Sequence, residues 1–220
     1  FAAAPLTQPA FDRTVFAGVK DLKLRADGNL PWQLDENLTD NWLKFIDAKI
    51  ADIETDSKPF FGFLFYDGIH GTSLPKDAEK PFQPSWNRVD HLSLNKDFDS
   101  TAYFNLYKNS AYQVDKQLKR VFDQLNEKNL LDETIVIVTS DHGQEFNDNK
   151  MNYWGHGSNF TPAQIHVPLV IHWPGKEKQV LKHRTSHSDI STTLMKDLFN
   201  VTNNIEDYSL GYHLKDTQRS

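Results

Sequence analysis

The sequence has 220 residues, of which 38% are hydrophobic and 12% aromatic, so it is long enough to bury one substantial core. Its net charge is −6, its pI is near 5.8 and it has no dense Lys/Arg cluster, so it lacks the positive field on which nucleic-acid binding depends. It contains no cysteine and no run approaching the roughly 20 apolar residues of a membrane span, so we expect neither a disulfide nor a membrane-spanning segment within it.

Residues 40–53 are predicted to form an amphipathic helix with Thr39 as its cap. The apolar stripe of this helix is formed by Trp42, Ile46, Ile50 and Ile53. Lys58 and Pro59 end this region, and the aromatic run at residues 60–66 is predicted to be a strand.

Residues 68–96 contain several prolines and charged residues, which predicts a long irregular loop. Phe82 and Trp86 within it either line a substrate cleft or pin the loop to the body of the protein. Residues 99–130 are predicted to form a long helix whose lysine and arginine side chains face solvent. Its apolar positions at helical spacing are Ala111, Val114, Leu118, Val121, Phe122 and Leu125.

Residues 134–139 are an unbroken β-branched run, typical of a strand covered on both faces in a parallel sheet. Ligands of open α/β sheets bind beyond the carboxyl ends of such strands. Asp141 and His142 lie at that end and are able to grip a divalent cation, while Gly143 lets the backbone turn sharply. A carboxylate and a histidine at a strand end also cap loops or bond each other, so the tripeptide alone leaves both interpretations open.

A second histidine, His156, follows a polar loop at residues 144–153 whose length suits folding back over the strand end. Residues 167–174 then contain another short apolar strand with a proline at its start. Residues 192–199 carry apolar residues at helical spacing. The order of elements is therefore strand, site loop, strand, helix.

These ordered elements resemble the carboxyl-terminal part of a sulfatase-like hydrolase domain of the alkaline phosphatase superfamily, over residues 60–201. The resemblance rests on the Ser-Asp-His-Gly and Gly-His-Gly motifs and on the helix before the metal strand. Residues 1–13 and 167–174 are similar to the YejM-type inner-membrane proteins of Gram-negative bacteria. The resemblance implies an α/β fold with a mostly parallel sheet flanked by helices, of which residues 1–220 form the C-terminal portion of one domain.

The resemblance also implies site residues. Asp141 and His142 match a pair that ligates a catalytic metal. His156 matches a histidine that contacts the substrate phosphate or sulfate, or that ligates a second metal. His70 matches a substrate-contacting histidine, with a loop histidine bonded to backbone as the alternative. For Asp189, or the serine before it, we expect a structural role as a helix cap.

The donor set favours zinc or manganese, whereas all-oxygen coordination would favour calcium or magnesium. Asp141 and His142, even with His156, fall short of the usual four ligands. The family's nucleophile and first acidic ligand come from upstream, and no Ser or Thr here lies in the nucleophile context, so we expect no activity from these residues alone.

Two functions of different class follow from the resemblance. The first is a metal-dependent hydrolase or phosphoryl transferase that acts on phosphate or sulfate esters, lipid-linked or not. We expect it at the periplasmic face of the bacterial inner membrane, attached through a segment outside this sequence. The alternative is a non-catalytic sulfatase-like domain that binds an envelope lipid or a partner protein.

Overall fold

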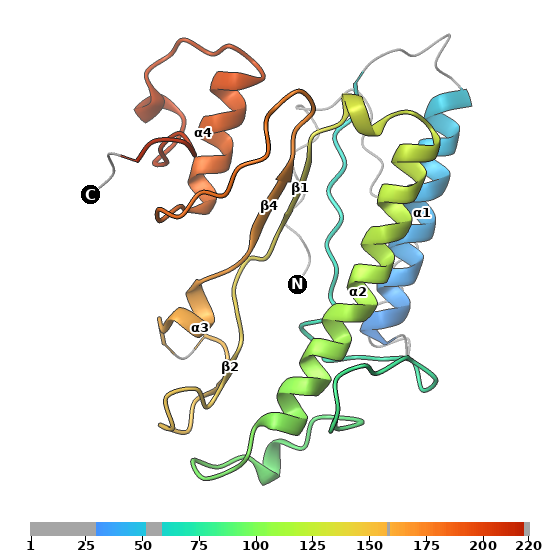
Figure 1. The fold of residues 1–220 in the computed structure, drawn as a ribbon, viewed down its shortest axis with the longest axis vertical. Coiled ribbons are helices and arrows are strands. Elements are labelled where there is room, and N and C mark those ends of the chain that lie inside the picture. The colour runs from blue at the N-terminus through green and yellow to red at the C-terminus, as the bar shows by residue number, and fades with distance from the viewer. Residues whose placement is uncertain (1–29, 52–58, 158, 218–220) are drawn as a thin grey trace. The chain divides into compact units, whose positions relative to one another are not determined.

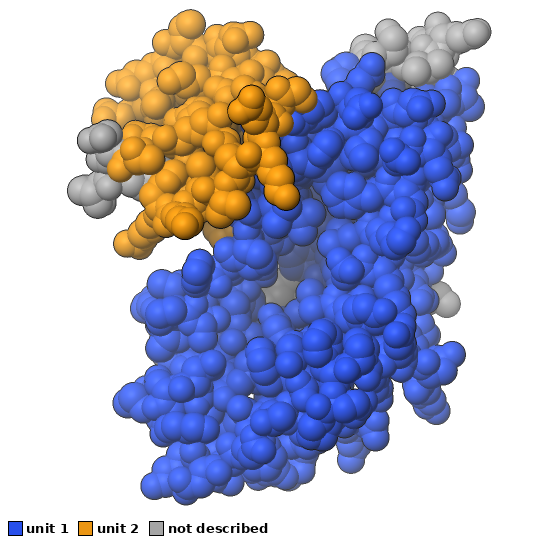
Figure 2. Space-filling view, viewed as in Figure 1, with its two compact units in different colours: residues 1–174 blue, residues 175–220 orange. Residues whose placement is uncertain are grey.

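The computed structural model describes residues 30–51, 59–157 and 159–217 (Figure 1). The chain divides into two compact units, residues 1–174 and 175–220 (Figure 2). The first unit holds two long helices and two small sheets, together with the short helices η3 (His91–Ser93), η4 (Leu131–Glu133) and α3 (Pro162–Ile165). The second unit holds α4 (His187–Asp197) and η5 (Ile205–Asp207).

Helix α1 (Pro31–Ala51) packs along α2 (Thr101–Glu127), and the two lie side by side in Figure 1. Trp42 and Ile46 of α1 meet Val121 and Leu125 of α2 in the apolar core, as the helical spacing predicts. The side-chain amide of Gln124 donates to the carbonyl of Leu43 across the same contact, at 2.7 Å.

The predicted start of α1 is wrong, because the helix begins at Pro31 and Thr39 lies inside it. Thr39 is buried, and its hydroxyl donates to the carbonyl of Asp35 instead of capping the helix. Asp35 and Thr39 continue the stripe of Trp42 and Ile46 at helical spacing. Because these two residues are polar, the apolar pattern marks only the second half of the helix, and the predicted start falls too late.

The predicted strand at residues 60–66 is also wrong, since no strand is assigned there. Phe61, Phe63 and Phe65 are 66%, 69% and 61% exposed, while Phe60 and Leu64 pack against the core of the two helices. The alternation therefore has the period of a strand. A strand also needs a neighbour to complete its ladder of hydrogen bonds, and alternation carries no information about that neighbour.

Residues 68–96 form the irregular loop that the prolines predict, and they are fastened to α2. The ring of Trp86 stacks on Tyr103, with ring centroids 5.4 Å apart. The amide of Asn109 bonds both the backbone N–H and the carbonyl of Phe82, at 3.1 and 3.0 Å. The stacking of Trp86 supports its interpretation as a pin, whereas Phe82 is held through its backbone and its side chain is 38% exposed.

Strand β1 (Val136–Thr139) pairs antiparallel with β4 (Leu169–His172), and β2 (Glu145–Phe146) pairs antiparallel with β3 (Trp154–Gly155). The expected α/β content is therefore present, but within the described ranges the paired strands are antiparallel and the mostly parallel sheet is not seen. A β-branched run predicts a strand but not the direction of its neighbour. Nor are both faces covered, since Val170 of β4 is 62% exposed.

In the second unit, Asp189 has a structural role at the start of α4, but the prediction of Ser188 or Asp189 as the cap is wrong, since the N-cap is Ser186. Its buried carboxylate accepts hydrogen bonds from the backbone N–H groups of Ser186 and Tyr212. The first bond satisfies a free backbone N–H group at the start of α4. The second bond attaches the segment after η5 to α4. Helix α4 begins before the apolar periodicity does, because the residues of its first turn are polar.

Replacing Ile46 by alanine tests the contact between α1 and α2. Ile46 is fully buried, so we expect the Ile46→Ala variant of the intact protein to lose about 2–5 kcal/mol of unfolding free energy. Lys44→Ala, at an exposed position of the same helix, serves as the control and should change it by less than about 0.5 kcal/mol. Equal losses in denaturant titrations of the two variants would contradict this account of the core.

Candidate functional site

Three histidines from separate segments gather in the first unit. His70 follows residues 60–66, His142 follows β1, and His156 follows β3. The ring centroids of His142 and His156 are 4.1 Å apart, those of His70 and His156 are 5.1 Å apart, and those of His70 and His142 are 6.4 Å apart. Asp141 adjoins the cluster, with its Oδ1 3.8 Å from Nε2 of His142. The structure thus brings together the four residues singled out in the sequence.

Each of the three imidazole rings has its Nδ1 beside an oxygen atom. The distances are 3.2 Å from His70 to Oδ1 of Asp67, 2.9 Å from His142 to the carbonyl of Gly143, and 2.9 Å from His156 to Oε1 of Gln144. The carboxylate of Asp67 lies within ion-pair distance of Nδ1 of His70. Carbonyl oxygens only accept hydrogen bonds, so the partners of His142 and His156 place the ring proton on Nδ1. In the neutral rings Nε2 is then left with a lone pair, as in histidines that bind metals or accept protons.

The turn after β1 is held by the segment that contains α3. The backbone N–H of Gly143 donates to the carbonyl of Gln164 at 2.7 Å. A Cβ atom at Gly143 would lie 2.1 Å from the carbonyl oxygen of Ala163, so no side chain fits there. The sequence predicted this glycine from the need for a turn, and the close approach of residues 163–164 is its physical reason.

A buried carboxylate that sequence reasoning missed fixes the other side of the site. Glu145 is fully buried, and its Oε2 accepts hydrogen bonds from the side chains of Gln164, Asn159 and Thr161 at 2.7, 2.9 and 3.2 Å. Oε1 of Gln164 in turn accepts from the backbone N–H of Gly157 at 2.9 Å. The Gly-His-Gly motif is therefore tied to the β2–β3 hairpin through Glu145.

Aromatic packing seats this hairpin on α2. The ring of Tyr103 lies with its centroid 5.0 Å from that of Phe146 and 6.2 Å from that of Trp154. Gln144 adjoins this hairpin, and its Oε1 lies 2.9 Å from Nδ1 of His156. Through the packing of Tyr103, α2 therefore supports the hairpin that Gln144 precedes and His156 follows.

The pKa of His156 is lowered from its ordinary value of 6.5, chiefly because burial disfavours the charged ring and then because His142 and His70 repel it. Asp141 acts in the opposite direction. His156 is therefore neutral at pH 7. Because folding lowers this pKa, the contribution of the ring to stability is complete above about pH 6.5 and is lost as the pH falls.

Asp141 and His142 suit a metal ion as two members of a larger ligand set. They offer one carboxylate and one imidazole at the end of a strand, and their side chains are 64% and 39% exposed. Among residues 30–51, 59–157 and 159–217, no group of three or more His, Asp or Glu side chains is arranged to hold a metal ion. The pair thus fits the chemistry of a divalent cation but does not complete its coordination.

Comparison with known proteins decides the family. The sulfatase family profile matches residues 6–201, which is most of the chain. This chain belongs to the sulfatase family. It is 34% identical over 128 residues to the inner membrane protein YejM of Salmonella typhimurium, covering 58% of this chain and 21% of that protein.

Two other sulfatase-family proteins match more of the chain. The sulfatase YdeN of Escherichia coli is 30% identical over 65% of this chain and 23% of its own length. An arylsulfatase of Clostridium perfringens is 27% identical over 84% of this chain and 43% of its own length. The chain therefore spans about a fifth of the length of the YejM and YdeN relatives. No helix in the described part of the chain is long and apolar enough to cross a membrane.

A methyl group at Gly143 should disturb the site because it collides with the backbone of Ala163. We expect Gly143→Ala to cost about 1–3 kcal/mol of stability and to shift the ring NMR signals of His142. Gly175→Ala is the control, because Gly175 has a positive φ of 73° but open space around its Cα. That control should lower stability without moving the His142 signals. Unchanged signals in Gly143→Ala would contradict the steric argument.

Removing the ring of His142 should raise the pKa of His156 toward 6.5, because one repulsive neighbour disappears while burial remains. The variant is His142→Gln, and the measurement is an NMR titration of the His156 ring. His187→Gln, at an exposed position in the second unit, is the matched control. A pKa of His156 that is the same in both variants would show that the two rings do not interact.

Proposed function

We propose that this chain supplies part of the active site of a metal-dependent sulfatase-like hydrolase or phosphoryl transferase that acts on phosphate or sulfate esters. The observation that carries the proposal is the cluster of His70, His142 and His156 beside Asp141, with each Nδ1 held by an oxygen. The packing of these loops does not explain why three oriented imidazoles lie next to a carboxylate, whereas a functional site does.

In this proposal Asp141 and His142 ligate the ion, for which their mixed oxygen and nitrogen donors favour zinc or manganese over calcium or magnesium. The bound ion supplies positive charge to the anionic oxygens of the ester. Nε2 of His70 and of His156 face the ester. When protonated, these atoms bind its oxygens or give a proton to the leaving group, and when neutral they accept one.

The proposal extends to the rest of the protein, because the relatives are several times longer than the matched span. The missing metal ligands and the nucleophile belong to segments outside this sequence. There too lies the membrane attachment, since the YejM relatives are inner membrane proteins. We place the domain at the periplasmic face, with β1 and β4 at the border of a larger, mostly parallel sheet.

Metal content of the intact protein tests the assignment of the ligands. We expect zinc or manganese close to one per chain, and its loss in the double variant Asp141→Ala, His142→Ala. Cleavage of phosphate or sulfate esters should fall by about 100-fold or more in the same variant. His187→Ala removes an exposed imidazole that does not belong to the histidine cluster, and it should leave both quantities unchanged.

Undiminished ester cleavage in the double variant would refute the metal assignment. Wild-type protein that contains no metal even with excess ion, and that retains an envelope lipid or a partner protein, would favour the non-catalytic alternative. Unfolding curves of both variants keep the result interpretable, since Asp141 and His142 lie at a strand end and contribute little to the core.

A further inference from the structure

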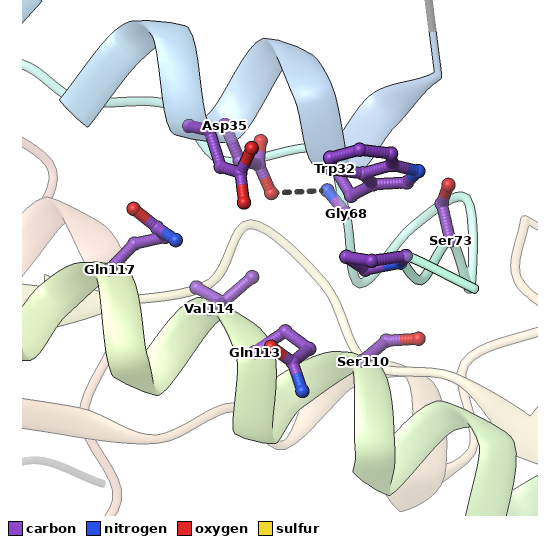
Figure 3. Close-up of a pocket in the computed structure, with 10 residues that line it drawn as sticks. Trp32, Asp35, Gly68, Ser73, Ser110, Gln113, Val114 and Gln117 are labelled. Carbon is purple, nitrogen blue, oxygen red and sulfur yellow. Dashed lines mark hydrogen bonds between the residues drawn. The ribbon is translucent and has the colours of Figure 1, made fainter. Parts of the chain in front are cut away.

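A buried carboxylate on α1 holds the backbone just before His70. Asp35 is 3% exposed, and its two oxygens accept hydrogen bonds from the backbone N–H groups of Asp67 and Gly68 at 2.8 and 2.9 Å. Figure 3 shows the bond to Gly68 and the wall of polar and apolar side chains around the carboxylate. One residue of α1 therefore binds two successive backbone N–H groups of the loop.

These two hydrogen bonds lie at the start of a turn that is closed by backbone hydrogen bonds. The N–H of Gly71 donates to the carbonyl of Asp67 at 3.0 Å, and the N–H of Ser73 donates to the carbonyl of Gly68 at 3.0 Å. The side chain of Asp67 reaches forward within this turn, with Oδ1 3.2 Å from Nδ1 of His70. A continuous chain of contacts thus runs from Asp35 through Asp67 to the imidazole ring.

We propose that Asp35 is a positioning residue, which fixes the backbone of Asp67 and Gly68 so that the Asp67 carboxylate aims the ring of His70 at His156. The proposal rests on the proposed function in so far as it gives His70 a ligand to bind. Within the described residues the Asp35 carboxylate accepts hydrogen bonds from the backbone of Asp67 and Gly68, so Asp35 acts on His70 through Asp67.

Burying the charged carboxylate of Asp35 costs free energy, which indicates that its role is to position the loop and not only to stabilise the fold. Burial raises the pKa of Asp35 to about 6, against the effect of the two backbone hydrogen bonds, and the nearby charges of Asp67 and Glu36 raise it as well. At pH 7 the folded protein therefore keeps a charged group where burial penalises it. The neutral groups that line the same pocket from α2 are Ser110, Gln113, Val114 and Gln117.

The fit between Asp35 and the turn is also tight. A Cβ atom at Gly68 would lie 2.5 Å from Oδ2 of Asp35, so the close approach of the amide requires a glycine. Thr39, one helical turn further along α1, holds the residue before this pair through the hydroxyl of Tyr66, at 3.1 Å. Three successive residues, 66–68, are thus fastened to one face of α1.

The test uses the intact protein with ¹⁵N-labelled histidine. In Asp35→Asn and Asp35→Ala we expect the ring NMR signals of His70 to move, with the His70 signals assigned by His70→Gln. The dissociation constant of inorganic phosphate should rise about tenfold. Glu36→Gln is the matched control, since Glu36 adjoins Asp35 and lines the same pocket but does not hold the turn. It should change neither quantity.

A second variant keeps the proposal testable if Asp35→Ala does not fold. Asp67→Ala leaves both backbone amides in place and removes the carboxylate that contacts His70. If Asp35 acts through Asp67, the His70 shifts of Asp35→Asn and Asp67→Ala will not add in the double variant. Additive shifts, or His70 signals that stay unchanged in Asp35→Asn while the melting temperature falls, would overturn the proposal. If phosphate does not bind to the wild type while the His70 signals still respond, the proposed function fails and the positioning role stands.

Discussion

The packing of α1 on α2 is the contact on which both histidine-bearing loops depend. Each helix supports one ring: α1 reaches His70 through Asp67, and α2 supports the hairpin next to His156 through Tyr103. The apolar contact of Trp42 and Ile46 with Val121 and Leu125 joins the two helices into one support. A shift of one helix along the other would therefore change the distance between the two rings. Close-packed interiors resist such shifts, so the site inherits the rigidity of the core.

Two buried carboxylates transmit this rigidity to the loops. Asp35 accepts two backbone N–H groups, and Glu145 accepts three side-chain donors through a single oxygen. The second oxygen of Glu145 is buried with no hydrogen-bond partner in the part of the chain that the structure describes. Burying such groups costs free energy that an apolar side chain would not cost. Their strong acceptors instead give each loop a single geometry, which a ligand site needs more than additional stability.

Helical periodicity predicted α2, and short β-branched or apolar runs predicted β1 and β4. Helical periodicity placed the start of α1 too late because Asp35 and Thr39 occupy the buried stripe with polar side chains. The site histidines were predicted from motif resemblance, since spacing alone does not bring His70 beside a residue that lies far along the chain. Glu145 gave no signal, because residues 144–153 have the polar composition of an exposed loop and hide the short strand β2. Strand direction was not predictable either, since it depends on the neighbour and not on the strand.

The protonation of the cluster bears on how an anion would be held. His156 is neutral at pH 7, because partial desolvation and the two neighbouring rings oppose a positive charge there. The carboxylates of Asp141 and Asp67 adjoin the rings, and the chain as a whole is acidic. A neutral imidazole offers its Nε2 lone pair but little charge, so the side chains alone would attract a phosphate or sulfate group only weakly. In the proposed function an ion at Asp141 and His142 would supply positive charge that the neutral ring of His156 does not.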